Sequence, residues 1–103
     1  MTLAELKTLL DATGFPVAYS HFNEIQTPPF ICYLVTGSSN FFADSVTYQK
    51  IDNVQIELYT TKKDLTAEGK LEKILDDNGI PYETIEIYIE TEKLFQKIYE
   101  VSL

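Results

Sequence analysis

Few residues in this 103-residue chain could carry out chemistry. The single histidine, His21, supplies with Asp44 and Ser45 the residue types of a hydrolytic triad. No G-x-S-x-G turn or comparable local motif surrounds Ser45, so the sequence does not position it as a nucleophile. We therefore expect His21 to be a surface or hydrogen-bonded strand residue, and we predict that the chain is not an enzyme.

The sequence also gives little support for a metal or phosphate site. One His and one Cys cannot assemble a Cys/His zinc set within a single chain. The acidic residues Glu83, Glu86 and Glu90 and the pair at 76–77 lack the spacing and central Gly of a calcium loop. The four glycines form neither G-x-x-x-x-G-K nor G-x-G-x-x-G. We predict no metal and no cofactor, and we interpret the acidic residues as a solvated face.

Cys32 lies in the apolar run FICYLV and is the one cysteine of the sequence. It cannot form an intramolecular disulfide, which is consistent with a cytosolic context. Because a lone cysteine in an apolar run usually packs as a small hydrophobic residue, we predict a buried structural thiol.

The charge balance argues against a protein that grips DNA. The formal net charge is −8, and all eight basic residues are Lys. Arg is the residue that makes bidentate contacts to phosphate and guanine, and a negative field repels the DNA backbone. An acidic surface can instead line a passage through which DNA slides by repulsion.

Composition indicates a folded chain without a membrane span. The sequence is 45% hydrophobic, which is too apolar for a disordered chain. No run of about 18 apolar residues is present, as a membrane-spanning helix would need. Charged residues interrupt the first ten residues, which therefore favour a helix over a signal peptide.

Periodicity and capping signals predict seven elements that must position these residues. Thr2 and Glu5 form a capping box, and Gly14 is suited to a left-handed helix end. In the predicted strand over residues 46–59, the apolar residues on both sides of Asp52-Asn53 fall on the same alternate positions. We therefore expect one continuous strand, although these two residues could also form a hairpin turn. The predicted helices are residues 2–13 and 64–78, and the predicted strands are 17–22, 30–35, 46–59, 85–90 and 94–101. We expect residues 37–40 to end the second strand.

The resulting order is α-β-β-β-α-β-β. It predicts a single α+β domain over residues 1–103, in which two helices pack on one face of a mostly antiparallel sheet. The last strand is apolar on both faces, so it requires a second cover that the helices do not supply.

Aromatic residues suggest where contacts with other proteins lie, because Tyr is enriched at interfaces. Phe41 and Phe42 are adjacent, so in an extended chain they point in opposite directions and one should be exposed. We predict a contact site on an arm that carries Phe41, Phe42 and Tyr48. A second contact is predicted on the other face of the sheet, through Leu94, Ile98 and Tyr99. The alternative is that the sheet simply uses aromatic residues that favour strands.

Several stretches resemble small tail-completion proteins of phages and prophages of Gram-positive bacteria. They are GFPVAYSHF after the first helix, VQIELYTTKKD, LDDNGIPYE and YIETEKLFQKIYEV. The resemblance implies a tail-terminator-like subunit that forms a homo-oligomeric ring, typically a hexamer, in the virion tail after assembly in the host cytoplasm. Its implied partners are the tail tube protein and a head-completion or neck protein. DNA would pass through the ring without specific binding, and no membrane is involved.

A different class of function stays open on the residues alone. A cytosolic α+β module that binds a small molecule or a regulatory partner would be a monomer or dimer with a closed apolar pocket. A ring subunit would instead form a larger species at high concentration.

Overall fold

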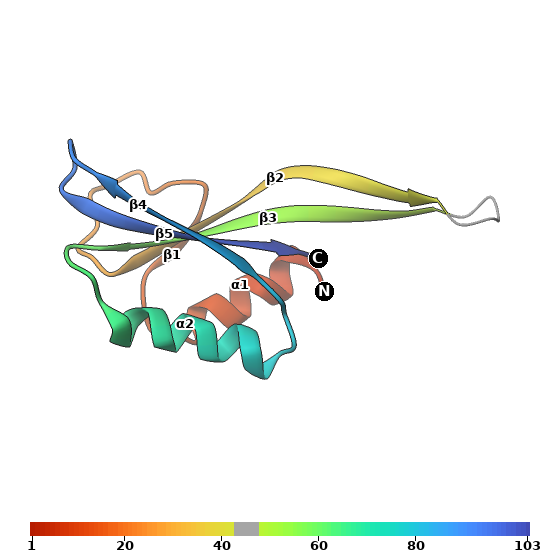
Figure 1. The fold of residues 1–103 in the computed structure, drawn as a ribbon, viewed down its shortest axis with the longest axis horizontal. Helices are drawn as coiled ribbons and strands as arrows, with labels where there is room; N and C mark the ends of the chain where they lie inside the picture. Colours follow the sequence, from red (N-terminus) through yellow and green to blue (C-terminus); the bar gives the residue numbers. More distant parts are fainter. Residues whose placement is uncertain (43–47) are drawn as a thin grey trace.

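The computed structural model describes the backbone of residues 1–42 and 48–103, and the side chains of residues 1–38 and 51–103. The order of elements is the one predicted (Figure 1). The helices are α1 (Leu3–Asp11) and α2 (Leu65–Asp77), and the strands are β1 (Val17–Tyr19), β2 (Phe30–Phe42), β3 (Tyr48–Thr60), β4 (Glu83–Ile89) and β5 (Leu94–Ser102).

Both helices begin at side-chain caps that satisfy free backbone N–H groups. The Thr2 hydroxyl accepts from the Glu5 N–H and the Glu5 carboxylate accepts from the Thr2 N–H, both at 3.1 Å, which confirms the capping box. The Asp64 carboxylate accepts from the Ala67 N–H at 3.0 Å. After α1 the chain turns at Gly14, whose φ of +83° is readily adopted only by a residue without a Cβ.

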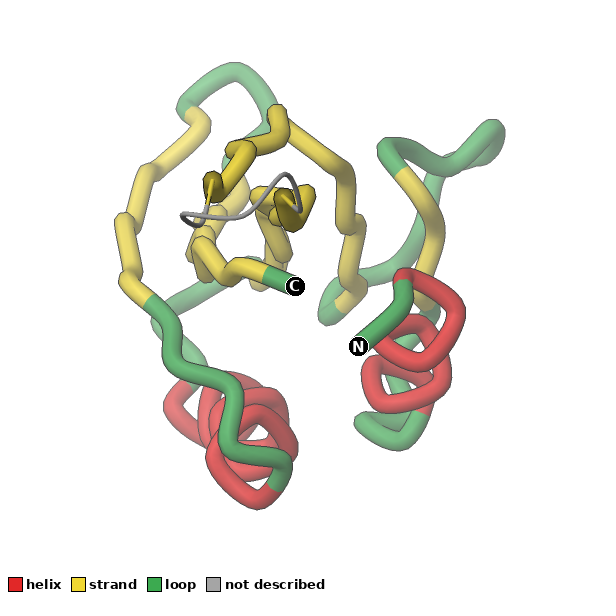
Figure 2. Tube along the Cα trace, turned by 90° about the vertical axis from the view of Figure 1, so that its right-hand side faces the viewer, coloured by secondary structure: helices red, strands yellow, loops and turns green. Residues whose placement is uncertain are grey.

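The five strands form one sheet in the order β1-β2-β3-β5-β4. β1 pairs with β2 in parallel, and the other neighbours pair antiparallel. Both helices lie on the same side of this sheet, as Figure 2 shows (helices red, strands yellow). The predicted α+β class, with a mostly antiparallel sheet and helices on one face, is confirmed.

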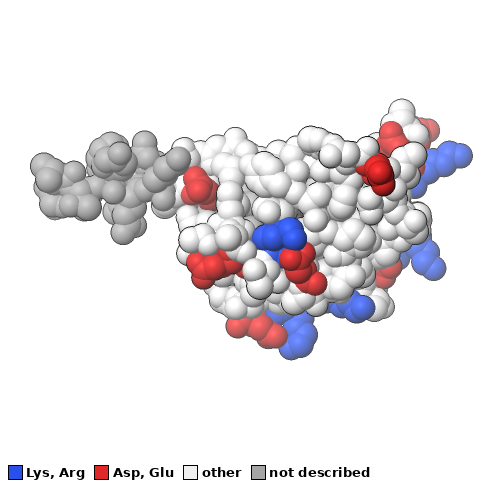
Figure 3. All heavy atoms as spheres, turned by 180° about the vertical axis from the view of Figure 1, so that it is seen from behind, with Lys and Arg blue, Asp and Glu red and all other residues white. Residues whose placement is uncertain are grey.

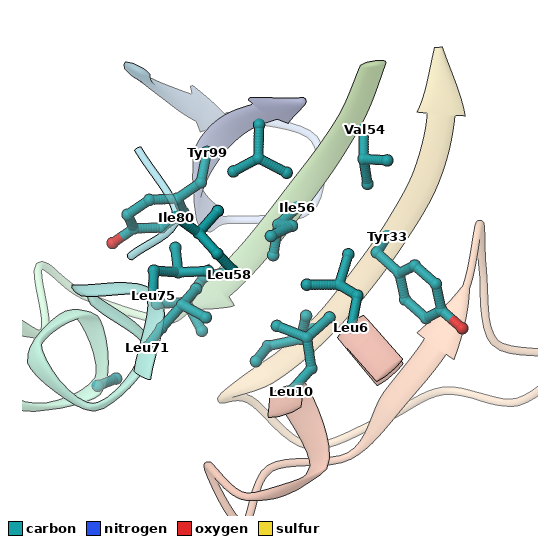
Figure 4. Close-up of a cluster of buried hydrophobic side chains, with 13 residues drawn as sticks. Leu6, Leu10, Tyr33, Val54, Ile56, Leu58, Leu71, Leu75, Ile80 and Tyr99 are labelled. Atoms are coloured by element: carbon teal, nitrogen blue, oxygen red, sulfur yellow. The ribbon is translucent and has the colours of Figure 1, made fainter. Parts of the chain in front are cut away.

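The core lies between the helices and one face of the sheet (Figure 4). β3 contributes every second residue to it, as its apolar parity predicted. The largest side chains with no more than 1% exposure are Leu6, Leu10, Ile31, Val54, Ile56, Leu58, Leu71, Leu75 and Tyr99.

Charged groups also join α2 to β5. Lys97 Nζ lies 2.8 Å from Glu68 Oε1, and the Tyr99 hydroxyl donates to Glu72 Oε2 at 2.7 Å. Burial opposes ionisation of Glu68, but the bonds and charges of Lys97 and Lys63 outweigh it and lower the pKa of this carboxyl. The buried carboxylate of Glu68 is therefore compensated by cations.

The second strand is longer than predicted. The segment 37–40 does not end β2, which continues to Phe42 with a register shift between Val35 and Gly37. Continuous pairing with β3 holds this polar stretch in a strand despite its weak β propensity. β3 runs through Asp52 and Asn53 as one strand, as predicted.

Beyond the sheet, residues 37–42 of β2 and 48–52 of β3 pair chiefly with each other and project as a two-stranded extension, which we call the arm (Figure 1). The chain consequently extends 50 Å along its longest axis but only 28 and 23 Å along the others.

Two leucines of α2 test the position of the core. Leu71 is 0% exposed, whereas Leu65 is 72% exposed. Leu71→Ala should lower the free energy of unfolding by about 2–5 kcal/mol, because it leaves a cavity under β3. Leu65→Ala should change it by about 0.5 kcal/mol or less. Urea denaturation measures both, and equal losses would contradict this packing.

Candidate interaction surface

The face of the sheet opposite the helices, which we call the helix-free face, is covered by neither of the helices described. Residues paired directly across strands share a face, so the register defines its composition. Three rows cross β2, β3, β5 and β4: Phe30, Tyr59, Gln96 and Ile87; Cys32, Glu57, Ile98 and Ile85; and Leu34, Gln55, Glu100 and Glu83.

The β4 side of this face is an apolar strip. Ile85 and Ile87 are 49% and 43% exposed, and they lie opposite Ile98 and Gln96 of β5. A third pair, Ile89 and Leu94, continues the strip. Aliphatic side chains that neighbour one another on an exposed sheet face mark a contact surface more strongly than scattered ones do.

β4 is also an edge strand of the sheet. Its residues are exposed from Glu83 to Tyr88, and only Ile89 is partly buried. An edge strand presents a row of backbone donors and acceptors that another chain can pair with. The edge and the isoleucine strip therefore offer a partner both hydrogen bonds and apolar area.

A polar chain crosses the middle of the helix-free face. Gln55 Nε2 donates to Glu57 Oε2 at 2.6 Å, and the Tyr59 hydroxyl donates to Glu57 Oε1 at 3.0 Å. Gln96 Nε2 in turn donates to the Tyr59 oxygen at 2.9 Å. Glu57 is only 8% exposed, and no ion pair joins it to any lysine or histidine whose side chain is described. It is thus a buried carboxylate held by neutral donors.

This carboxylate affects its two neighbours. Burial, and then the charge of Glu57, raise the pKa of the Cys32 thiol to about 11. The same two causes and the hydrogen bond to Glu57 raise the pKa of the Tyr59 hydroxyl. Both groups are therefore neutral near pH 7.

The predicted arm residues lie where an arm is found, but their side chains are outside the described residues. The backbones of Phe41 and Phe42 end β2, and Tyr48 begins β3 opposite Phe42. Their contact role stays a prediction.

The predicted second-face residues divide between the two faces. Leu94 and Ile98 lie on the helix-free face, Leu94 partly buried and Ile98 7% exposed. Including Tyr99 was wrong, because it lies opposite Ile56 on the helix side and is 0% exposed. Residues 98 and 99 are consecutive in a strand, so their side chains point to opposite faces.

Of the three residues considered for catalysis, the structure describes only His21. Its Nδ1 lies 3.2 Å from the Ser20 hydroxyl, and Asp44 and Ser45 are outside the described residues. Within the described part of the chain, no group of three His, Cys, Asp or Glu side chains could hold a metal ion. None of the helices described there is long and apolar enough to cross a membrane.

Charge is distributed unevenly over the surface. On the side shown in Figure 3, acidic and basic side chains are scattered around a broad uncharged area, and the lysines do not gather into one patch. Four lysines of the described residues are paired with carboxylates: Lys7, Lys63, Lys73 and Lys97. This arrangement does not favour a DNA-gripping surface.

Sequence reasoning missed the importance of Glu57, Ile85 and Ile87. The alternation of Ile with Glu and Tyr over residues 85–89 indicates a strand with all its isoleucines on one face. This pattern is the one sequence signal from which the isoleucine strip could have been predicted. The place of Glu57 beside Cys32 and Ile98 depends on the pairing of distant strands, which local patterns do not specify.

Comparisons with known proteins define the fold of this chain. No family model and no curated protein matches the sequence. A solved chain in the structure described as "Virion of native gene transfer agent (GTA) particle" superposes with a TM-score of 0.66 and 9% sequence identity. The match covers 97% of this chain and 85% of that one. The two chains therefore share a fold over nearly all of this chain and most of the other.

The reactivity of Cys32 tests the burial of the helix-free face. A pKa of about 11, against an ordinary 9.0, should lower the thiolate fraction near pH 8 about hundredfold. With a thiol-reactive aromatic disulfide, the native protein should therefore react at least about 100 times more slowly than the urea-unfolded chain. Equal rates, followed by absorbance of the released thiolate, would contradict a buried Cys32.

Proposed function

We propose that this chain is a structural protein of a phage-type virion: a ring-forming subunit that caps the tail tube and joins the tail to the head. The observation that carries the proposal is the shared fold, over 97% of this chain, with a chain of a virion particle. The resemblance of four sequence stretches to tail-completion proteins supports the same class, independently of the superposition.

The difference between the two faces of the sheet suits a ring subunit. The core on the helix side is formed within one chain, whereas the β4 edge, the isoleucine strip and the arm can contact neighbouring subunits. The arm and the body of the sheet are different surfaces. A contact between the arm of one copy and the sheet of the next would therefore be head-to-tail. Head-to-tail contacts generate a closed ring when the rotation between copies closes.

The charge also suits a ring through which DNA passes. The chain has 16 acidic residues, eight Lys and no Arg, so a lumen built from it repels the phosphate backbone. We propose the tail tube protein and a head-completion or neck protein as its partners, with assembly in the cytoplasm of the host. In this role the protein acts by binding alone.

Solution mass tests the ring. Light scattering after size exclusion, from micromolar to near-millimolar protein, should show a species of about six 11.8 kDa chains that grows with concentration. Negative-stain images of that fraction should show rings. A strict monomer at every concentration, or a stable dimer with no larger species, would contradict a self-closing ring and favour a cytosolic binding module.

The arm variant Phe41→Ser/Phe42→Ser separates assembly from folding in the same measurement. We expect the ring to disappear while the melting temperature stays within about 2 °C of the parent, because the backbone at both positions lies on the arm, beyond the part of the sheet that pairs with β5. Leu65→Ala, an exposed apolar residue on α2, is the matched control and should leave the ring intact. Loss of the fold in the arm variant would show that these phenylalanines are structural.

A further inference from the structure

A hollow of about 450 Å³ opens at the end of the helix-free face, where the isoleucine strip ends at Leu94. The loop after β1 forms one wall, from Ser20 to Gln26, and Glu92 and Leu94 at the β4–β5 turn form the other. Its base is made by Phe30, Cys32 and Tyr59 from β2 and β3.

Aromatic rings line this hollow in a fixed arrangement. Phe30 and Tyr59 are stacked, with centroids 4.8 Å apart and planes at 16°. Phe22 meets Phe30 edge-on, with centroids 5.6 Å apart and planes at 90°. Ring faces carry partial negative charge, so such a set of rings attracts a cation as well as apolar groups.

Two carboxylates and one histidine line the hollow. Glu24, Glu92 and His21 lie in its walls, and no lysine does so among the described residues. Behind the base, Glu57 is bonded to the Tyr59 hydroxyl and has only neutral donors. A buried carboxylate without a cation is unfavourable, and an incoming cation would relieve this.

We propose that this hollow is a docking site for a lysine or arginine side chain of another protein, with the aliphatic stem against the aromatic rings and the cationic group near Glu24, Glu92 and Glu57. A second copy of this chain is the weaker candidate, because it has no Arg and could offer only lysine. Among the described lysines, only Lys62 and Lys93 are in neither an ion pair nor contact with an aromatic ring. That the partner is another virion protein rests on the proposed function, but the chemistry of the hollow does not.

Selective ¹⁵N-cysteine labelling tests the site directly, since Cys32 is the one cysteine and gives one amide signal from the base of the hollow. The probes are n-butylammonium and n-propylguanidinium, which match the two side chains, with n-butanol as the neutral control at equal ionic strength. Both cations should shift the Cys32 signal saturably, with dissociation constants in the range of about 1–50 mM. The alcohol should not.

Charge variants give the matched control. Glu24→Gln/Glu92→Gln should weaken cation binding about fivefold or more. Asp11→Asn/Asp77→Asn makes the same change in net charge at exposed ion pairs on the helices and should alter binding less than twofold. Phe22→Leu should weaken binding of the cations without affecting the response to the alcohol.

Three results would overturn the proposal: no saturable shift with either cation, an equal saturable shift with the alcohol, or equal losses in both charge variants. Because the titration reads one amide in any oligomeric state, its outcome is independent of whether the ring forms. If no ring forms in solution but the cations still shift the Cys32 signal saturably, the proposed function is rejected and the cation site is retained.

Discussion

The structure depends on burying one face of β3. Val54, Ile56 and Leu58 are each at most 1% exposed, and burial of such side chains contributes about 1.5–3 kcal/mol each. β2 and β5 pair on either side of this strand and add Ile31 and Tyr99 to the same face. Both helices then cover that face, and no further helix is described for the other. The helix-free face is thus a direct consequence of how the core is built.

Because the core lies on one side of the sheet, the two faces of the molecule differ. On the helix side the apolar side chains are buried, and the carboxylate of Glu68 is paired with lysines. On the opposite side, the isoleucine strip is half exposed and Glu57 has no cationic partner among the described residues. A free subunit tolerates this apolar area and this carboxylate. Contact becomes favourable when a partner covers the apolar area and brings a cation to the carboxylate. These features suit a protein that works by assembly.

Much of the fold could be predicted because its signals are local. Thr2, Glu5 and Asp64 define the helix starts, and the parity of Val54, Ile56 and Leu58 fixes β3 as one strand. The length of β2 could not be predicted from local signals, because residues 37–40 are held in a strand only by pairing with β3. Tyr99 was misplaced because β5 is apolar on both faces, so its pattern alone does not identify the core side. The surroundings of Glu57 depend on register between distant strands.

In the role we propose, the chain ends tail growth and provides the surface on which the head docks. The most direct measurement is tail length, by electron microscopy of particles from the encoding phage or prophage with this gene deleted and then restored in trans. We expect tubes of uncontrolled length without heads in the deletion, and normal virions on restoration. Tails of normal length joined to heads in the absence of the protein would contradict it.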